Sequence, residues 1–425
     1  MKKLLLAGFG FIFLSVSHAQ KTYIWCGTLI DGISNEPKKN MTIVVEKNKI
    51  TAVTSGFSTA GTNDKSIDLK TKTVTPGWID MHVHFEHEPK KGNLADQFTH
   101  NPSDVAFESL KYASVTLMAG FTTVRDLGGS GVNISLRNAI NKGLVIGPRI
   151  YTAGKSIATT GGHADPTNGY RKDLMGDPGP KEGVINGVED AYQAVRQRYK
   201  EGSDLIKITA TGGVLSQAKD GANAQFTEEE IKAIVMTAKD YGFKVAAHAH
   251  GAEGMKRAIR AGVNSIEHGT FMDDEGMQLM KQYGTWLVPT IIAGKSTADS
   301  AKIPGYYSEI VTPKALTTGL QIQATFAKAY KAGVKIAFGT DAGVFPHGKN
   351  WIEFGYMIEA GMPAMEAIKA ATISAAELLG EKERLGSIEV GKLADIIAVD
   401  GDPLIDARIF GKVVFVMKDG VVYKQ

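Results

Sequence analysis

The sequence has almost no cysteine and no long apolar run beyond its first residues. Its 425 residues include a single cysteine, Cys26, so no intramolecular disulfide can form and stability must come from a buried core. Trp25 precedes this cysteine, which is a poor match to a lipoprotein site, where a small residue is expected. After residue 19 no apolar stretch reaches the roughly 20 residues that span a bilayer. We therefore expect no membrane-spanning helix.

Charge and motif content narrow the class further. The net charge is +3, with 22% charged residues, which does not point to nucleic acid or to an anionic membrane surface as a partner. The sequence has no internal repeat, no low-complexity tract, no phosphate-binding glycine-rich loop and no serine-nucleophile motif. Its length suits a large barrel with an accessory domain.

The first 19 residues have the pattern of a secretory signal peptide. Lys2 and Lys3 precede an apolar run over residues 4–16, and Ser17-His18-Ala19 supplies a small-x-small cleavage site. The apolar run is too short for a membrane anchor. We predict cleavage after Ala19 and export to a bacterial periplasm or to the exterior.

The remaining chain divides into three predicted segments. Residues 20–75 and 385–425 contain short strands and turns, and together they are predicted to form one small β-sandwich domain. Residues 76–384 alternate strands with amphipathic helices. Terminal strands are expected at 23–29, 41–46, 49–54, 66–69, 386–392, 395–399, 412–417 and 421–424.

The middle segment predicts an α/β fold of the (β/α)8 TIM barrel type, because eight strands are each followed by a helical stretch. Strands are expected at 79–83, 122–127, 149–153, 205–210, 244–249, 265–267, 286–289 and 335–340. Helices are expected at 104–118, 188–201, 227–241, 251–261, 274–283, 313–332 and 363–379. Long loops are expected at 85–103, 155–187, 211–225 and 290–312, on the face that carries the active site of such barrels.

Two histidines end the first barrel strand, in the run Pro76-Gly77-Trp78-Ile79-Asp80-Met81-His82-Val83-His84. Residues two apart in a strand point to the same side, so His82 and His84 project together and could hold one metal ion. The alternative is a pair of ordinary loop histidines, because short motifs also match by chance.

Further polar side chains lie in or at the ends of later strands. They are Lys207 in the fourth strand, His248 and His250 after the fifth, His268 after the sixth and Asp341 after the eighth. Each alone has an ordinary explanation, such as a surface histidine or a helix-capping aspartate. The lysine is harder to explain, because lysine is almost never fully buried unpaired. Jointly the side chains face one mouth of the barrel and predict a metal site.

The same residues carry a resemblance to a known family. The run 76–84 and the tail Gly386-Ser387-Ile388-Glu389-Val390-Gly391-Lys392-Leu393-Ala394-Asp395-Ile396 resemble the amidohydrolase superfamily. Within it, three segments are similar to the branch that holds imidazolonepropionase and the Xaa-Pro dipeptidase-like hydrolases. They are Thr160-Gly161-Gly162-His163-Ala164-Asp165, Ala247-His248-Ala249-His250-Gly251 and Ile266-Glu267-His268-Gly269.

This resemblance implies a role for each ligand. His82 and His84 would bind the more buried of two divalent ions, expected to be Zn²⁺, and His248 and His268 would bind the other. Asp341 would ligate the first ion and carry the proton during catalysis. Lys207, carboxylated by carbon dioxide, would bridge the two ions; an unmodified Lys207 beside a single ion is the alternative. Independently, zinc takes nitrogen and oxygen ligands and activates a water.

Other residues are assigned to the substrate or to the framework. The resemblance places His163 and His250 in the substrate pocket, in a catalytic or binding role, although either could instead support a ligand. Loop residues could bind a substrate carboxylate, but solvated surface is the more common place for them; they are Tyr170, Arg171, Lys295, Tyr306 and Tyr307. Glu267 is expected to point away from the site, and Arg125-Asp126 to form a buried ion pair or a loop anchor.

The sequence therefore predicts an exported, metal-dependent hydrolase that cleaves the amide bond of dipeptides or N-acyl amino acids. One alternative is a cyclic-amide hydrolase like imidazolonepropionase, which the predicted export argues against; a lactonase or another amidase on the same metal site is a further one. A barrel that only binds a small metabolite is an alternative of another class, and the complete ligand set argues against it. No nucleic-acid partner is expected, and a homo-oligomer is left open.

Overall fold

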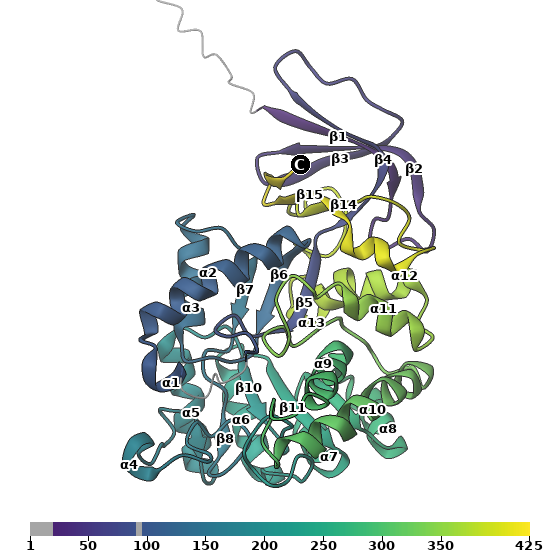
Figure 1. Ribbon diagram of the computed structural model, residues 1–425. Coiled ribbons are helices and arrows are strands. Elements are labelled where there is room, and N and C mark those ends of the chain that lie inside the picture. Colours follow the sequence, from purple (N-terminus) through teal and green to yellow (C-terminus); the bar gives the residue numbers. More distant parts are fainter. Residues whose placement is uncertain (1–19, 91–95) are drawn as a thin grey trace, which may run out of the picture.

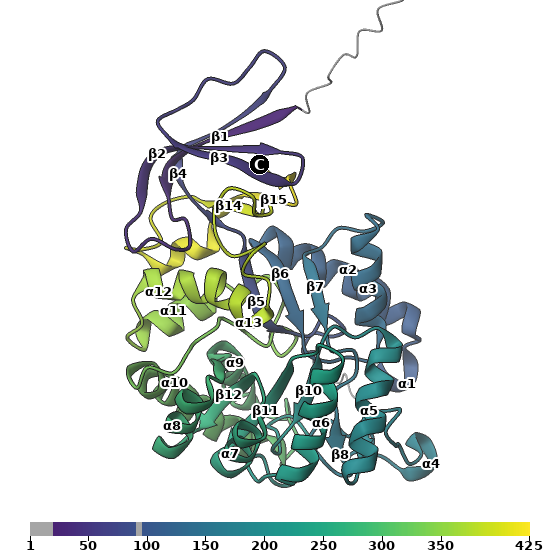
Figure 2. The ribbon, with the colours of Figure 1, turned by 180° about the vertical axis from the view of Figure 1, so that it is seen from behind.

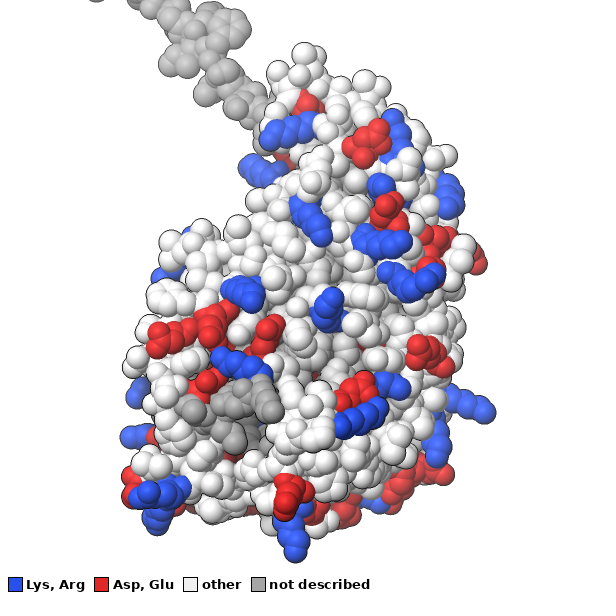
Figure 3. Space-filling model, in the orientation of Figure 1, with Lys and Arg blue, Asp and Glu red and all other residues white. Residues whose placement is uncertain are grey.

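The computed structural model describes residues 20–90 and 96–425, which form two stacked parts (Figure 1). A sheet built from both ends of the chain lies on a larger α/β body, as the view from behind also shows (Figure 2). The predicted signal peptide, residues 1–19, lies outside the described residues. On the face in Figure 3, basic and acidic side chains are interspersed, in keeping with the net charge of +3.

The terminal sheet has seven strands in the order β16-β15-β14-β4-β1-β2-β3. They are β1 Lys21–Leu29, β2 Lys38–Glu46, β3 Lys49–Ser55, β4 Lys65–Pro76, β14 Ile396–Val399, β15 Val413–Lys418 and β16 Val421–Lys424. β4 joins the two ends of the chain, because it pairs in parallel with β1 and antiparallel with β14. Ile24, Ile43, Ile396 and Phe415 are fully buried in the core of this sheet.

The strand pairing does not confirm the predicted β-sandwich, because it joins both chain ends into one continuous sheet. The strand expected at 386–392 is also wrong, since these residues form turns. The ammonium of Lys392 donates to the Ser387 hydroxyl at 2.6 Å and to the Leu385 carbonyl at 3.2 Å. These bonds fold the segment back on itself, so its residues do not extend into the sheet.

Parallel strands form the interior of the α/β body. One sheet contains β5 Trp78–Val83, β6 Phe121–Asp126 and β7 Arg149–Thr152; the other contains β10 Ile206–Thr209, β11 Val245–Gly251, β12 Ser265–Phe271 and β13 Trp286–Val288. Isolated bridges link the two sheets, Ile157 with Ile208, and residues 336–342 with Leu287 and Val83. A short pair, β8 Ala158–Thr159 and β9 Val184–Ile185, lies beside them. The arrangement is a TIM-barrel-like α/β fold.

The eighth strand, predicted at 335–340, is not a regular strand. Within this span only Ile336 forms a bridge, to Leu287. Hydrogen bonds to the side chain of the buried Asp80 replace part of the backbone pairing that a regular strand would make. The Asp80 carboxylate accepts from the Thr340 amide at 3.0 Å, from the Thr340 hydroxyl at 2.6 Å and from the Asn350 side chain at 2.7 Å. These bonds fix the residue before Asp341.

Helices cover the outside of the strands (Figures 1 and 2). Those near predicted positions are α2 Pro102–Met118, α5 Val188–Glu201, α6 Glu228–Asp240, α7 Ala252–Ala261, α8 Asp274–Tyr283, α10 Val311–Lys331, and α12 Ala364–Lys369 continued by a π-helical turn Ala370–Ser374 and α13 Ala375–Leu379. Those not predicted are α1 Asp96–Thr99, α3 Val132–Asn141, α4 Lys172–Met175, α9 Ile291–Ala301, α11 Ile352–Glu359 and a 3-10 turn Ala407–Gly411. Across the described residues, none of the helices is long and apolar enough to cross a membrane.

The connection after β13 is partly helical, which corrects the long loop predicted at 290–312. The N-terminus of α9 is held by Glu353 on α11, whose carboxylate accepts from the amides of Ile291 and Ile292 at 2.8 and 2.7 Å. These bonds satisfy two of the N–H groups that a helix leaves free at its start. Because Glu353 lies 61 residues beyond Ile292, a pattern read along the chain could not reveal this cap.

Candidate active site

A cavity of about 270 Å³ brings the predicted site residues together at the carboxyl ends of the strands. Its polar lining consists mainly of His82, His84, His163, Lys207, His248, His250, His268 and Asp341. All the predicted ligands therefore face one space, although their individual roles stay predictions.

His82 and His84 extend from the end of β5 towards Asp341. Nε2 of His82 lies 3.5 Å from Oδ1 of Asp341, and Nε2 of His84 lies 3.2 Å from the same oxygen. Asp341 has φ of +62°, a conformation that is uncommon outside glycine and that clusters at functional sites. Burial opposes ionisation of Asp341, but the neighbouring His82 and His84 hold its pKa below the usual range.

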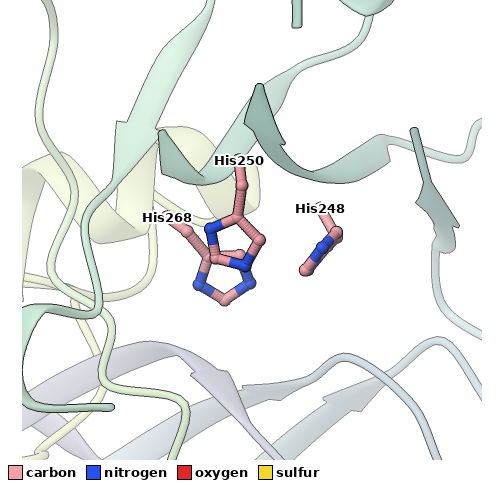
Figure 4. Close-up of side chains that lie close together, drawn as sticks. All are labelled: His248, His250 and His268. Carbon is pink, nitrogen blue, oxygen red and sulfur yellow. The ribbon is translucent and has the colours of Figure 1, made fainter. Parts of the chain in front are cut away.

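Three histidines form a second group on β11 and β12 (Figure 4). The rings of His250 and His268 stack with centres 4.9 Å apart, and the ring of His248 stands across them at 4.7 Å from each. One ring nitrogen of each lies within 4.8 Å of the others. His268 also groups with His82 and Asp341, so the two groups share it. His250 was predicted to contact substrate. Its ring nevertheless lies about as close to those of His248 and His268, two predicted ligands, as these two lie to each other.

Four of these rings have one nitrogen anchored by the protein. The anchoring contacts are Nδ1 of His84 to the Gly128 carbonyl at 2.8 Å, Nε2 of His248 to the Gly212 carbonyl at 3.1 Å, Nδ1 of His250 to the Thr270 hydroxyl at 2.8 Å and Nδ1 of His268 to the Thr290 hydroxyl at 2.7 Å. A carbonyl can only accept, so His84 and His248 donate through those nitrogens. The carbonyl bonds fix the tautomers of His84 and His248, whereas a threonine hydroxyl can donate or accept. Anchoring of one ring nitrogen is usual for metal-binding histidines.

The charge states of the histidines suit metal binding. Burial lowers the pKa of His82, His248 and His268 well below its ordinary value, and that of His250 to about 4. Neutral imidazole is the form that ligates a metal. His84 differs: burial works against its protonation, but its hydrogen bond to Asp341 raises its pKa.

Lys207 lies on β10 inside the cavity. Its side chain is only 4% exposed, and Nζ lies 3.2 Å from Nε2 of His82. Burial lowers the pKa of Lys207 to about 8, so the amine loses its proton more readily than an exposed lysine. Lys207 therefore shares one cavity with His82 and His84, while its carboxylation and bridging role stay predictions.

Glu267 also belongs to the site, which corrects the prediction that it points away. Its Oε2 lies 3.0 Å from Nδ1 of His82, and its Oε1 lies 2.8 Å from the guanidinium of Arg125. The neighbouring His268 has φ of +73°, which breaks the strand alternation and lets consecutive side chains both face inward. Asp126 serves as a loop anchor, because its carboxylate accepts from the Phe85 amide at 3.0 Å.

His163 packs over the second group of histidines. Its ring centre lies 4.4 Å from that of His248, and its Nδ1 is buried without a hydrogen-bond partner. Burial lowers the pKa of His163 to about 3. Gly213 approaches so closely that a Cβ there would lie 2.2 Å from the His163 ring. This neutral ring therefore lies beside the predicted metal site, with Nδ1 covered by the backbone of Gly213.

The residues predicted to bind a substrate carboxylate are not among the described residues that line the cavity. Arg171 is exposed and pairs with Asp173 at 2.5 Å. Lys295 lies on α9 with its ammonium 5.0 Å from the ring centre of Tyr356. Tyr170 packs edge-on against a nearby phenylalanine at 5.6 Å. Their role in substrate binding stays a prediction without geometric support.

His87 lines the cavity and was missed from the sequence. Its ring stacks on that of His84 at 5.6 Å, and burial lowers its pKa to about 4. Its position three residues after the His-x-His pair was the available signal. The pattern gave no reason to distinguish it from the rest of the loop that begins at residue 85.

The donors fit a divalent metal. They combine imidazole nitrogens with one carboxylate, the ligand types that zinc and similar ions take. Oδ1 of Asp341 is buried and lies 3.2 Å from Nε2 of His84 and 3.5 Å from Nε2 of His82, so a carboxylate oxygen and two imidazole nitrogens converge where an ion could bind. Fold and site therefore define a TIM-barrel-like protein that could hold metal at the carboxyl ends of its strands, where this fold places catalytic groups.

Comparison with known proteins identifies the family. Residues 73–424 match the model of the amidohydrolase family, and the chain belongs to that family of hydrolases. A solved Xaa-Pro dipeptidase with bound methionine is 55% identical, with a TM-score of 0.94, over 96% of this chain and 100% of that one. Ochratoxinase of Aspergillus niger is 32% identical over 97% of this chain and 88% of its own. Imidazolonepropionase of Fusobacterium nucleatum is 26% identical over 85% of this chain and 86% of its own. The predicted resemblance is confirmed.

Proposed function

We propose that the protein hydrolyses the amide bond of dipeptides or N-acyl amino acids with the help of two divalent ions, Zn²⁺ being the first choice. The observation that carries the proposal is the set of buried histidines that face one cavity with Asp341, four of which have one ring nitrogen anchored by a carbonyl or a hydroxyl. The 55% identity to an Xaa-Pro dipeptidase supports a dipeptide as substrate.

The predicted ligands would bind the two ions in two groups. His82, His84 and Asp341 would hold one ion, and His248 and His268 the other. When bound, such ions supply a water of lowered pKa and polarise the scissile carbonyl. Asp341 would take the proton from the attacking water and return it to the leaving nitrogen, acting as general base and then as general acid. His163 and His250, both neutral, would hydrogen-bond to the substrate.

Lys207 is proposed to be carboxylated. Its unprotonated amine would attack carbon dioxide and release a proton to solvent, forming a carbamate whose single negative charge is shared by two oxygens. Burial lowers the pKa of Lys207 to about 8, which favours the unprotonated amine that this step requires. An ammonium in the same place would repel two cations, whereas a carbamate would attract both.

Export of the protein is proposed on the sequence pattern of residues 1–19. The protein recovered from expressing bacteria should begin at residue 20 and should lie outside the cytoplasm. Amino-terminal sequencing of the fractions tests this, and full-length protein that stays in the cytoplasm would contradict it.

A substrate screen tests the proposed activity. Protein reconstituted with Zn²⁺ is assayed against Xaa-Pro and other dipeptides, N-acyl amino acids, a cyclic amide and a lactone. We expect turnover of a dipeptide or an N-acyl amino acid, and a loss of about 10²–10⁴-fold in kcat in Asp341→Asn, the usual contribution of a general base. Asp68→Asn, at an exposed aspartate, is the control. Turnover of the cyclic amide or the lactone alone would contradict the proposal.

A further inference from the structure

The cavity has an apolar wall that the proposed chemistry does not use. Its residues are Val214 and Leu215 after β10, Ala293, Gly294 and Thr297 on α9, and Ile322 on α10. The hydroxyl of Thr297 donates to the Ala293 and Gly294 carbonyls of its own helix, so it needs no partner in the cavity. Among the described residues that line the cavity, Lys207 carries the only ammonium and Asp341 the only carboxylate, and both are predicted metal ligands.

The helical side of this wall is rigid, because glycines let α9 and α10 pack closely. A Cβ on Gly294 would lie 2.9 Å from the Ile322 side chain, and a Cβ on Gly319 would lie 2.3 Å from that of Ala298. Side chains packed this tightly have little freedom to move. The shape of this side is therefore set before a substrate enters.

The other side of the wall is a loop held by one ammonium. Nζ of Lys314, on α10, donates to the carbonyls of Gly213 at 3.1 Å, Ser216 at 2.8 Å and Ala218 at 2.7 Å. A lysine ammonium has three donors, and all three are used on this loop. Lys314 therefore fixes the position of residues 213–218 relative to α10.

Leu215 lies at the mouth of the cavity and is 38% exposed, although it is a large apolar residue. Its neighbour Val214 is buried against Ala301 and Ala315, which gives Val214 a packing role. Leu215 leaves part of its apolar surface in water, and a side chain entering the cavity would cover it.

We propose that this wall is a subsite for one apolar side chain of the amide substrate, and that Lys314 positions the loop that completes it. The inference rests on the proposed function and narrows its substrates. An apolar side chain would leave water and contact the wall. A charged side chain would lose its hydration without finding an opposite charge beyond the groups reserved for the ions.

Two measurements test the subsite in the Zn²⁺-loaded protein. The first is hydrolysis of dipeptides and N-acetyl amino acids whose side chains are varied in turn among Gly, Ala, Leu, Met, Asp and Lys. The second is calorimetric binding of free leucine and methionine against glycine and aspartate, which requires no turnover. We expect at least about tenfold preference for Leu over Gly at one position, the discrimination that a few methylene groups provide.

The outcomes separate the two claims. If none of the amides is hydrolysed but leucine binds better than glycine, the proposed function fails and the apolar subsite stands. If amides are hydrolysed with equal efficiency for Gly, Leu and Asp side chains at both positions, the subsite is wrong and the proposed function stands.

Leu215→Ala locates the subsite, with Leu320→Ala as its matched control. Leu215 is partly exposed and Leu320 is 85% exposed on α10, so both variants should fold. Leu215→Ala should lower the Leu-to-Gly ratio of kcat/KM by about threefold to tenfold, mainly through KM, because it removes apolar contact area. Leu320→Ala should leave the ratio unchanged. An unchanged ratio in Leu215→Ala would overturn the assignment of the loop to the subsite.

Lys314→Met tests the positioning of the loop. It keeps an unbranched side chain, one atom shorter, and removes the three donors, so KM for the Leu substrate should rise at least about threefold while kcat changes little. Lys314→Arg retains several N–H donors and should restore part of the loss. Lys328→Met, at an exposed lysine of the same helix, is the control. A fall in kcat with unchanged KM, or no rescue by arginine, would overturn the role of Lys314.

Discussion

Glu267 joins His82 to a buried cation: one carboxylate oxygen lies 3.0 Å from Nδ1 of His82 and the other 2.8 Å from the Arg125 guanidinium. Glu267 is fully buried. The opposite nitrogen of His82 lies 3.2 Å from Nζ of Lys207. A carboxylate on the far nitrogen of a metal-binding histidine orients the ring and raises its basicity. Glu267 is therefore placed to orient the ring of His82, a predicted metal ligand.

Glu267→Gln should weaken metal binding. The variant keeps the size of the side chain but removes its charge from His82 and leaves Arg125 without its anion. We expect metal affinity to fall about 10–100-fold and the free energy of unfolding to fall by about 3–5 kcal/mol, the cost of breaking a buried ion pair. Zinc titration of the folded metal-free protein and denaturant unfolding measure the two effects. Glu36→Gln, at an exposed glutamate, is the control, and unchanged zinc affinity would contradict the role of Glu267.

The sequence predicted the site residues that obey simple strand geometry. His82 and His84 are two apart at a strand end, and Lys207 interrupts an apolar strand, so both could be recognised from their neighbours. The strand and helix pattern placed most of these elements within a few residues of their true bounds. The pattern of strands and helices was therefore sufficient to predict that the candidate ligands of several strands lie at one end of the fold.

Features set by contacts distant in sequence could not be predicted. The inward direction of Glu267 depends on the +73° φ of His268, which no alternation rule includes. The start of α9 depends on Glu353, a residue of another helix. Neither feature follows from the local pattern of polar and apolar residues.

Lys207→Ala should lose one of two bound ions while the protein stays folded. Elemental analysis should give near two zinc ions per chain in the wild type and near one in the variant, with most activity lost. Added short carboxylic acids, whose anions resemble a carbamate, should restore part of the activity. Full activity in Lys207→Arg would contradict the carbamate, because a guanidinium stays protonated and does not take up carbon dioxide.

The stability of the metal-free protein should depend on pH through His347. This ring stacks on Tyr112 at 4.9 Å, its Nδ1 is buried without a hydrogen-bond partner, and burial lowers the pKa of His347 to about 3. An unfolded histidine binds a proton near pH 6.5. Between about pH 6.5 and 3 the unfolded state therefore binds the proton first, and the stability present above pH 6.5 is lost as the pH falls.

His347→Gln should reduce this pH dependence. Between pH 6.5 and 5.5 the wild type should lose roughly 1 kcal/mol more than the variant, since each pH unit within the window is worth about 1.4 kcal/mol per proton. Denaturant unfolding of the metal-free proteins at the two pH values gives the difference. His100→Gln, at a half-buried histidine elsewhere, should behave as the wild type. Parallel pH profiles for the wild type and His347→Gln would contradict the prediction.

Glu353→Gln should disturb both the wall of the cavity and the ligand His268. The Glu353 carboxyl group caps α9 through Ile291 and Ile292, and the residue before them, Thr290, has φ of +51° and anchors Nδ1 of His268 at 2.7 Å. Burial raises the pKa of Glu353 to about 8, so the substitution removes no charge at pH 7. It replaces an acceptor oxygen with an NH₂ group that faces a backbone N–H.

The expected loss is therefore one of geometry: about 1–2 kcal/mol in the free energy of unfolding, as for a lost helix cap. Zinc affinity should fall as well, because Thr290 no longer holds the His268 ring in place. Denaturant unfolding at pH 7 and zinc titration measure the two effects, and Glu359→Gln, at an exposed glutamate of the same helix, is the matched control. A stability loss with unchanged zinc affinity would show that Glu353 supports α9 alone and does not act on His268.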